Sequence, residues 1–294
     1  MGYANIIQDI LEHIDSNLME ELSADNLAKK AAFSTYHFCR VFSWHVGYSV
    51  MEYIRLRRLA YAASELSTGK NIIDIAMDYG FETHSGFSKA FKRYYGVSPK
   101  EYKAYNHTAK PPLPNLINTN NLYNIGGIIM EPKFKALKDI KLVGYVLKTK
   151  NVEGENSKDI PAFWQDCLES GKLEKLHSES FTKNDKEYGA CFSIDPITGE
   201  FLYVIGLEVK DGAEIPKEYY TCTIPKATYA IFAIPPVNKD EDFVKNIQGT
   251  WVFIMNEWFP SSEYEYAPNG ADFELYYEAD GKMTCDIYIP VIKK

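Results

Sequence analysis

Apolar residues in the first third of the chain recur at the spacing that places them on one face of an α-helix. The clearest run comprises Ile6, Ile7, Ile10, Leu11, Ile14 and Leu18. Short segments with the same period follow up to about residue 105. We therefore expect an all-α unit at the start of the chain.

Beyond about residue 130 the period changes to two, which is typical of β-strands with one buried face. Apolar residues alternate with small or polar ones along residues 188–194 and 201–207, and the turn sequence DPITG separates these segments. A second predicted hairpin covers residues 272–290 and turns at Asp280-Gly281.

Each hairpin follows a stretch of helical period, at residues 160–176 and about 242–258. The order strand, helix, strand, strand therefore occurs twice in this half. Such a duplicated pattern predicts an α+β domain in which the helices cover one face of an antiparallel sheet. We expect the opposite face of the sheet to form a cleft.

A segment with neither period separates the two halves. It contains KPPLPNLINTNN, which is rich in proline and asparagine, as linkers often are. A chain of 294 residues is about the right length for two domains. The predicted organisation is multi-domain, with an all-α domain at residues 1–106, a linker at 107–130 and an α+β domain at 131–294.

The net charge of −8 is unevenly distributed along the chain. The first 106 residues contain 12 basic and 12 acidic side chains, whereas residues 131–294 contain 19 basic and 28 acidic ones. In the first domain the basic residues gather at 55–58 and 89–103. A local basic face for nucleic acid is therefore compatible with an acidic chain.

The five cysteines are odd in number and widely spaced, without the spacing of a disulfide framework or a metal site. We expect reduced, buried thiols, no metal and no cofactor. The first residues lack the features of a signal peptide, and no apolar run is long enough to cross a bilayer. The expected location is the cytoplasm, without a membrane partner.

The first domain contains an internal repeat. AFSTYHFCRVFSWHVGYSVMEY aligns with YGFETHSGFSKAFKRYYGVSPKEY at an offset of 48 residues and, after one inserted residue, of 49. The matched pairs are Ala28 with Ala76, Phe33 with Phe81, Phe38 with Phe87, Arg40 with Lys89, Phe42 with Phe91, Gly47 with Gly96, Ser49 with Ser98, Glu52 with Glu101 and Tyr53 with Tyr102.

Each copy predicts a short helix, a turn and a second amphipathic helix that stops at a glycine, before a Ser-x-x-Glu capping box. The predicted inward residues are Phe38, Val41 and Phe42 in the first copy and Phe87, Ala90, Phe91 and Tyr94 in the second. The predicted outward residues are Tyr36, Arg40 and Ser43, and Ser85, Lys89 and Lys92.

A helix that carries basic and small polar residues on its outer face fits the major groove of B-DNA. The predicted helix at about residues 50–66 is roughly 25 Å long and separates the two copies. Both second helices are then able to enter successive major grooves, which recur about every 34 Å. On the pattern alone, a helical bundle without a DNA role remains the alternative.

Residues 1 to about 106 resemble the DNA-binding domain of the AraC/XylS family of transcription regulators. The resemblance rests on YIRLRRLAYAASEL at 53–66 and on IIDIAMDYGFETHSGFSKAFKRYYGVSPKEYK at 72–103, where the glycines, phenylalanines and proline of the family signature are in place. It implies a sequence-specific regulator that binds promoter DNA through two helix-turn-helix units and contacts RNA polymerase.

The resemblance also implies which residues contact DNA. The base-facing positions correspond to Tyr36, Cys39 and Arg40 in the first reading helix and to His84, Ser85 and Lys89 in the second. Phosphate contacts are expected from helix N-termini and from Lys30, Lys92 and Lys100. For the arginines at 55, 57 and 58, structural salt bridges and DNA contacts both remain open.

Residues 131–294 resemble the GyrI-like domains that bind small-molecule effectors. The resemblance rests on IPAFWQDCL at 160–168, YVIGLEV at 203–209, ATYAIF at 227–232 and DFELYYEADGKMTCDIYIPV at 272–291. A reader domain followed by a sensor domain is the order of the Rob-type members of the AraC/XylS family.

Glu274 is the main candidate for ligand binding, because it alternates with Phe273 and Leu275 and so shares a face with Tyr276. A carboxylate among aromatic rings suits a cationic or aromatic ligand, and the GyrI-like resemblance implies a ligand-contacting glutamate at this position. A solvated strand glutamate is the alternative. Further candidates for the cleft are Tyr145, Trp164, Tyr203 and Tyr229, although Trp164, Trp251 and Trp258 also have the spacing of core residues.

We expect a regulator that is not an enzyme. Two other functions remain open for the second domain, since some GyrI-like proteins resemble hydrolases of small molecules and others resemble inhibitors that bind a protein target. The sequence contains no phosphate-binding loop and no Ser-His-Asp arrangement in this half.

Overall fold

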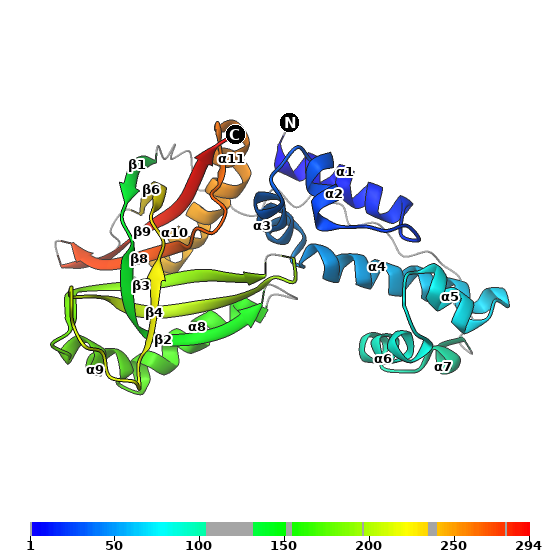
Figure 1. Cartoon of the computed structure of the whole chain (residues 1–294), viewed down its shortest axis with the longest axis horizontal. Helices are drawn as coiled ribbons and strands as arrows, with labels where there is room; N and C mark the ends of the chain where they lie inside the picture. Colours follow the sequence, from blue (N-terminus) through cyan, green and yellow to red (C-terminus); the bar gives the residue numbers. More distant parts are fainter. Residues whose placement is uncertain (1, 104–131, 151–154, 196, 235–239, 280) are drawn as a thin grey trace.

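The computed structural model describes residues 2–103, 132–150, 155–195, 197–234, 240–279 and 281–294. These residues form a helical domain and a domain built on one antiparallel sheet, side by side (Figure 1). The predicted two-domain fold class, all-α followed by α+β, is confirmed. The predicted linker at 107–130 lies outside the described residues.

The helical domain consists of seven α-helices and one short 3-10 turn among the described residues. Their bounds are α1 Tyr3–Ser16, α2 Ala24–Lys30, α3 Thr35–Val46, α4 Val50–Glu65, η1 Leu66–Thr68, α5 Ile72–Asp78, α6 His84–Tyr95 and α7 Pro99–Lys103. The long α4 separates α3 from the group α5, α6 and α7, so that the two repeated units lie at opposite ends of the domain (Figure 1).

The helix ends follow the predicted signals. Gly47 and Gly96 end α3 and α6 in the left-handed conformation, each with φ of 77°, where a side chain would be strained. The second capping box is complete, because Ser98 and Glu101 each accept the other's backbone N–H. In the first box, Ser49 accepts the N–H of Glu52, whose carboxylate binds Arg55 instead.

Packing inside the repeats differs from the prediction at Tyr94 and at Ser43, which was expected to face outward and is only 6% exposed. Phe38, Phe42, Phe87 and Phe91 are fully buried, as predicted. Tyr94 was expected inside but is 49% exposed. Its neighbour Tyr95 packs on Phe91 instead, with ring centroids 4.5 Å apart. The prediction for Tyr94 is wrong, because a helix of 3.6 residues per turn gives Tyr95, four residues after Phe91, the better position over that ring.

The arginines of α4 have structural partners. Arg57 forms an ion pair with Asp15 and joins α4 to α1. Arg58 donates to the backbone carbonyls of Leu18 and Glu20 beyond the end of α1. These contacts fix the first helix against the long one.

The second domain contains nine described strands in one antiparallel sheet. Eight follow the order β1-β6-β9-β8-β3-β4-β2-β5, and β7 pairs with β9. The bounds are β1 Lys133–Leu137, β2 Ile140–Lys150, β3 Thr182–Asp195, β4 Glu200–Val209, β5 Tyr220–Ile224, β6 Ala227–Ile234, β7 Tyr264–Tyr266, β8 Asp272–Ala279 and β9 Lys282–Lys293.

The helices of this domain are interrupted where the sequence predicted continuous helices. The single helix expected at 160–176 is two, α8 Glu155–Glu169 and α9 Lys172–Ser178, because Gly171 adopts a left-handed φ of 72° between them. The second predicted helix, at about 242–258, consists of α10 Asp240–Phe253, a π-helical turn η3 Ile254–Trp258 and α11 Phe259–Ser261.

The two faces of the sheet have different partners. Phe273 and Leu275 belong to a core on the face that none of the described helices covers, where the rings of Phe273 and Tyr288 stack at 4.4 Å. Glu274 and Tyr276 face α8 and α10. The expectation of a cleft opposite the helices is therefore wrong, since aromatic rings fill that face and the open space lies on the helical side.

Candidate nucleic-acid interface and ligand cavity

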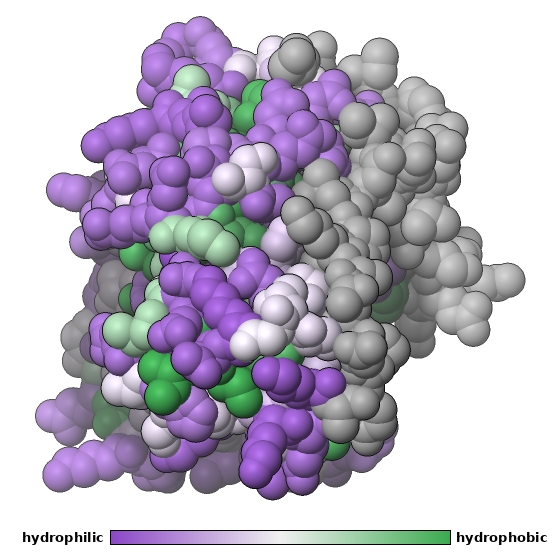
Figure 2. Space-filling view, turned by 90° about the vertical axis from the view of Figure 1, so that its right-hand side faces the viewer, coloured by the Kyte–Doolittle hydropathy of each residue, from purple (hydrophilic) through white to green (hydrophobic). Residues whose placement is uncertain are grey.

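The second reading helix, α6, presents its predicted base-facing residues to solvent. Thr83 caps the helix by accepting the N–H of Gly86, and His84, Ser85 and Lys89 are exposed along it. The predicted phosphate-contacting residues Lys30, Lys92 and Lys100 are also exposed. The end of the molecule that carries α5 to α7 is mainly hydrophilic, with small apolar patches (Figure 2).

The corresponding residues of α3 are buried or half-buried, and Tyr36 and Arg40 contact the second domain. Cys39 is 1% exposed. The Tyr36 hydroxyl donates to the carbonyl of Gly270 at 3.5 Å. Arg40 Nη2 lies 2.6 Å from Asp272 Oδ2, and its guanidinium stacks over the Tyr266 ring at 4.5 Å.

His37, on the same helix, lies in the centre of this contact. It is fully buried, and its Nδ1 accepts the backbone N–H of Tyr266 at 3.2 Å. That bond assigns the proton to Nε2, which lies 2.9 Å from the Tyr3 hydroxyl. Burial, together with the positive charges of Lys294 and Arg40, lowers the pKa of His37 to about 3. The imidazole is therefore neutral at physiological pH.

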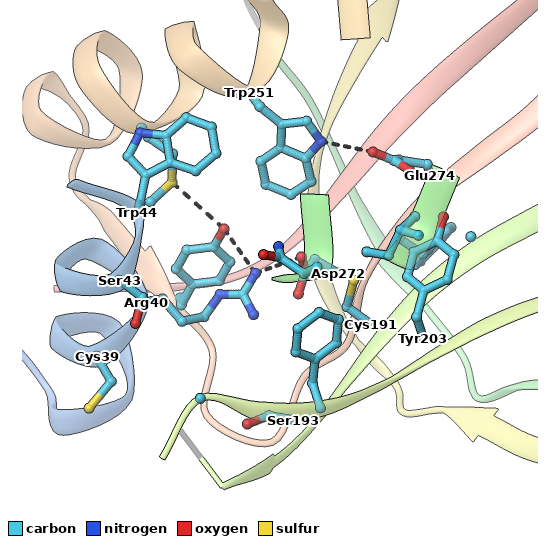
Figure 3. A pocket seen from close by; sticks show the side chains of 18 of the residues that line it. Cys39, Arg40, Ser43, Trp44, Cys191, Ser193, Tyr203, Trp251, Asp272 and Glu274 are labelled. Atoms are coloured by element: carbon cyan, nitrogen blue, oxygen red, sulfur yellow. Dashed lines mark hydrogen bonds and ion pairs between the residues drawn. The ribbon is translucent and has the colours of Figure 1, made fainter. Parts of the chain in front are cut away.

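A cavity of about 540 Å³ lies between α3 and the second domain. Its wall is formed by α3, α8, α10, η3, β3, β4, β7 and β8, and Figure 3 labels side chains from α3, α10, β3, β4 and β8 around it. Rings and apolar groups that line it include Trp44, Ile160, Phe201, Tyr203, Trp251, Val252, Met255 and Tyr266. A cavity of this size and character suits an organic ligand of moderate size.

Glu274 lines the cavity and is held by two aromatic donors. Trp251 Nε1 donates to Oε1 at 2.9 Å (Figure 3), and the Tyr276 hydroxyl donates to Oε2 at 2.7 Å. Burial raises the pKa of the Glu274 carboxyl, and these two hydrogen bonds offset part of the rise. The carboxyl group is thus fixed in position, but no positively charged side chain is paired with it among the described residues.

The charges around the cavity are mainly negative. Four carboxyl groups line it, from Asp195, Glu200, Asp272 and Glu274, whereas Arg40 is the one lysine or arginine among the lining residues described. Arg40 already pairs with Asp272. The remaining acidic excess favours a positively charged ligand.

The predicted ligand residues fall into three groups. Glu274 and Tyr203 line the cavity. Tyr276 and Trp164 stand behind it, where Trp164 Nε1 donates to the Tyr203 hydroxyl at 2.8 Å. The structure does not place the other two candidates, Tyr145 and Tyr229, at the cavity. The Tyr145 hydroxyl donates to the carbonyl of Lys172, and Tyr229 is buried in the core on the opposite face of the sheet.

The sequence analysis did not assign several residues to the site, among them Asp272, Trp251 and Gly189. Asp272 precedes Glu274 by two, so strand alternation already placed both on one face. Trp251 was considered only as a core residue. Gly189 lies opposite Glu274 in the β3–β8 pairing, and an added Cβ there would lie 2.3 Å from the Tyr203 hydroxyl. A glycine inside a predicted strand is a signal for such a close approach.

The described part of the chain offers little other chemistry. No group of three or more His, Cys, Asp or Glu side chains there has metal-binding geometry. All five cysteines are free, and burial raises the pKa of the Cys39 thiol to about 12. No described helix is long and apolar enough to cross a membrane.

Known proteins resemble both parts of the chain. Residues 27–105 match the family described as Helix-turn-helix domain, and residues 133–291 match the Integron-associated effector binding protein family. The Right origin-binding protein of Escherichia coli (strain K12) is 32% identical over 310 residues, which cover 99% of both chains. The HTH-type transcriptional regulator YbfP of Bacillus subtilis (strain 168) is 42% identical over 106 residues, which span 36% of each chain. The solved structure of SAV2435 bound to tetraphenylphosphonium covers 55% of this chain and 94% of its own, at 23% identity and a TM-score of 0.46.

Proposed function

This chain belongs to the AraC/XylS family of DNA-binding transcription regulators, in the order of a reader domain followed by an effector-binding domain, and on that premise we propose that the cavity beside Glu274 binds a cationic, aromatic effector. The reader extends over residues 1–106 and the sensor over 131–294, with 107–130 as the linker. Effector binding then changes how the chain acts on a promoter and on RNA polymerase.

In the proposed DNA complex each reading helix enters a major groove. His84, Ser85 and Lys89 of α6 read base edges, and Tyr36, Cys39 and Arg40 of α3 do so in the adjacent groove. Phosphate contacts come from Lys30, Lys92 and Lys100. The exposure of the α6 residues supports this assignment, and the contacts of the α3 residues are considered below.

The half-buried Glu274 carboxyl group in the cavity wall is the observation that carries the effector proposal. A carboxylate in a cavity lined by aromatic rings attracts a cation through its charge and through the faces of the rings. No lysine or arginine is paired with it among the described residues; both of its oxygens accept from aromatic side chains. A bound cation therefore supplies the compensation that the empty site lacks.

Calorimetry with tetraphenylphosphonium tests the proposal, since this ion is cationic and aromatic and has no hydrogen-bond donor. Glu274→Gln keeps the shape and removes the charge, so loss of the ion–ion attraction is expected to lower its affinity for this cation by at least about 1 kcal/mol, or about fivefold. Glu278→Gln is the matched control, because Glu278 is an exposed residue of the same strand. Undiminished binding by Glu274→Gln would refute the role of the carboxylate.

A pH series gives a second readout of the same site. Because the pKa of Glu274 is raised in the empty site, a bound cation lowers it again. The affinity for the cation is expected to fall as the pH drops through the pKa of the free carboxyl group. Glu274→Gln is expected to lose this pH dependence.

A further inference from the structure

We infer that the sensor domain holds the first reading helix away from DNA, and that Asp272 is the site where Arg40 and a cationic effector compete. The effector part of this inference rests on the proposed function. The inhibitory contact does not, because it follows from the positions of α3 and β8 alone.

The contact uses the face of α3 that DNA would need. Of the three positions assigned to base contact, Tyr36 and Arg40 contact the second domain, and Cys39 is buried and lines the cavity between α3 and that domain. The ion pair with Asp272 at 2.6 Å and the stacking on Tyr266 hold the Arg40 guanidinium against the sensor domain and away from a base edge. A major groove also encloses an inserted helix on both sides, in the space that the sensor domain occupies.

α6 differs from α3 in this respect. Its base-facing residues are exposed, and Figure 1 places it at the end of the molecule away from the sheet. The described arrangement is therefore able to offer one reading helix to DNA but not two. Specific binding through both helices requires α3 to leave the sensor domain.

Asp272 makes the separation of α3 from the sensor domain energetically unfavourable. Its side chain is only 4% exposed, and Arg40 is the cation beside it. When one partner of a buried ion pair leaves, the other remains as an uncompensated charge, which is strongly unfavourable. Release of α3 is thus opposed as long as nothing replaces the guanidinium.

A cation in the cavity is able to replace it. Asp272 and Arg40 both line the same cavity as Glu274, so a cation bound there lies beside Asp272 and repels Arg40. Trp44 of α3 also lines it, with its ring 6.4 Å from that of Trp251, so the occupant touches the reading helix directly (Figure 3). Cation binding therefore favours release of α3 and raises the affinity for DNA, and by linkage DNA raises the affinity for the cation.

The inhibitory contact is tested without any ligand. The full-length chain is used to select tight-binding duplexes from a random DNA library, and affinities for a selected duplex are measured by fluorescence anisotropy. Asp272→Asn keeps the shape and removes the charge, so it is expected to bind this duplex about fivefold or more tightly than the unmodified chain, within the usual range of allosteric coupling. Glu278→Gln is expected to bind it unchanged.

Affinity of Asp272→Asn that is equal to or weaker than that of the unmodified chain would overturn the inference. Glu265→Gln provides a second variant at the other end of the contact, where Glu265 Oε2 accepts the N–H of Ser34 at 3.3 Å. It lies outside the cavity lining, and a smaller rise in DNA affinity is expected. If Asp272→Asn does not fold, an unchanged affinity of Glu265→Gln overturns the inference.

The effector part has its own readout. Tetraphenylphosphonium is expected to raise the DNA affinity of the unmodified chain and to have little further effect on Asp272→Asn. A cation that binds in calorimetry but leaves DNA affinity unchanged would overturn the coupling. Failure of the Glu274 test would instead remove the proposed effector site, and the increase in DNA affinity of Asp272→Asn would still establish the inhibitory contact.

Discussion

Acidification is expected to destabilise the contact between α3 and the sensor domain through His37. This histidine packs against Tyr3 of α1, Phe33, Phe259 and Tyr266, and the charged groups that lower its pKa are Lys294 and Arg40. Its pKa is about 3 in the structure, against about 6.5 for an unperturbed histidine. Since the pKa is lowered, the stabilisation is fully present above about pH 6.5 and is lost as the pH falls toward about 3.

The magnitude follows from these two pKa values. At pH 5.5 an exposed histidine is about nine-tenths protonated, whereas buried His37 stays neutral. Between pH 7.5 and pH 5.5 the state in which His37 is exposed gains about 1.4 kcal/mol, close to a factor of ten. This applies to unfolding of the chain and, as far as His37 becomes exposed, to release of α3.

Urea denaturation of the full-length chain at the two pH values measures the effect. His37→Gln keeps an acceptor for the Tyr266 N–H but does not titrate, so its free energy of unfolding is expected to change less with pH, by about 1.4 kcal/mol. Other groups, including His45 and Glu274, cancel in this difference because both proteins contain them. An identical pH dependence for both proteins would refute the assignment to His37.

Two further predictions concern residues on either side of the contact. Gly189→Ala would place its Cβ 2.3 Å from the Tyr203 hydroxyl, so Tyr203 must move and release Trp164. We expect the free energy of unfolding in urea to fall by about 1–3 kcal/mol, as for other overpacked cores. An unchanged stability would contradict the described position of Tyr203. Lys89→Ala is expected to cost about 1–3 kcal/mol on the selected duplex if Lys89 reads a base, and an equal loss on random DNA would show that it contacts only phosphate.

The elements themselves could be predicted from the sequence because their signals are local. The stripe that begins at Ile6 formed α1, and the glycine stops and the second capping box of the repeat lie where expected. Alternation also placed Glu274 and Tyr276 on one face of β8. Each of these features depends on residues a few positions apart, and backbone geometry relates such residues directly to one another.

Tertiary structure alone decided which face of the sheet holds the cavity and what covers the first reading helix. Alternation separates Glu274 from Phe273 but does not say which of the two faces the helices cover, and the choice depended on how the rings of Phe273, Tyr229 and Tyr288 fill the other face. Arg40 and Asp272 are 232 positions apart, and no periodicity relates them. They pair because the two domains pack against each other, and each domain has its own sequence pattern. Complementary charge and shape decide which surfaces meet, and these surfaces exist only once each domain has folded.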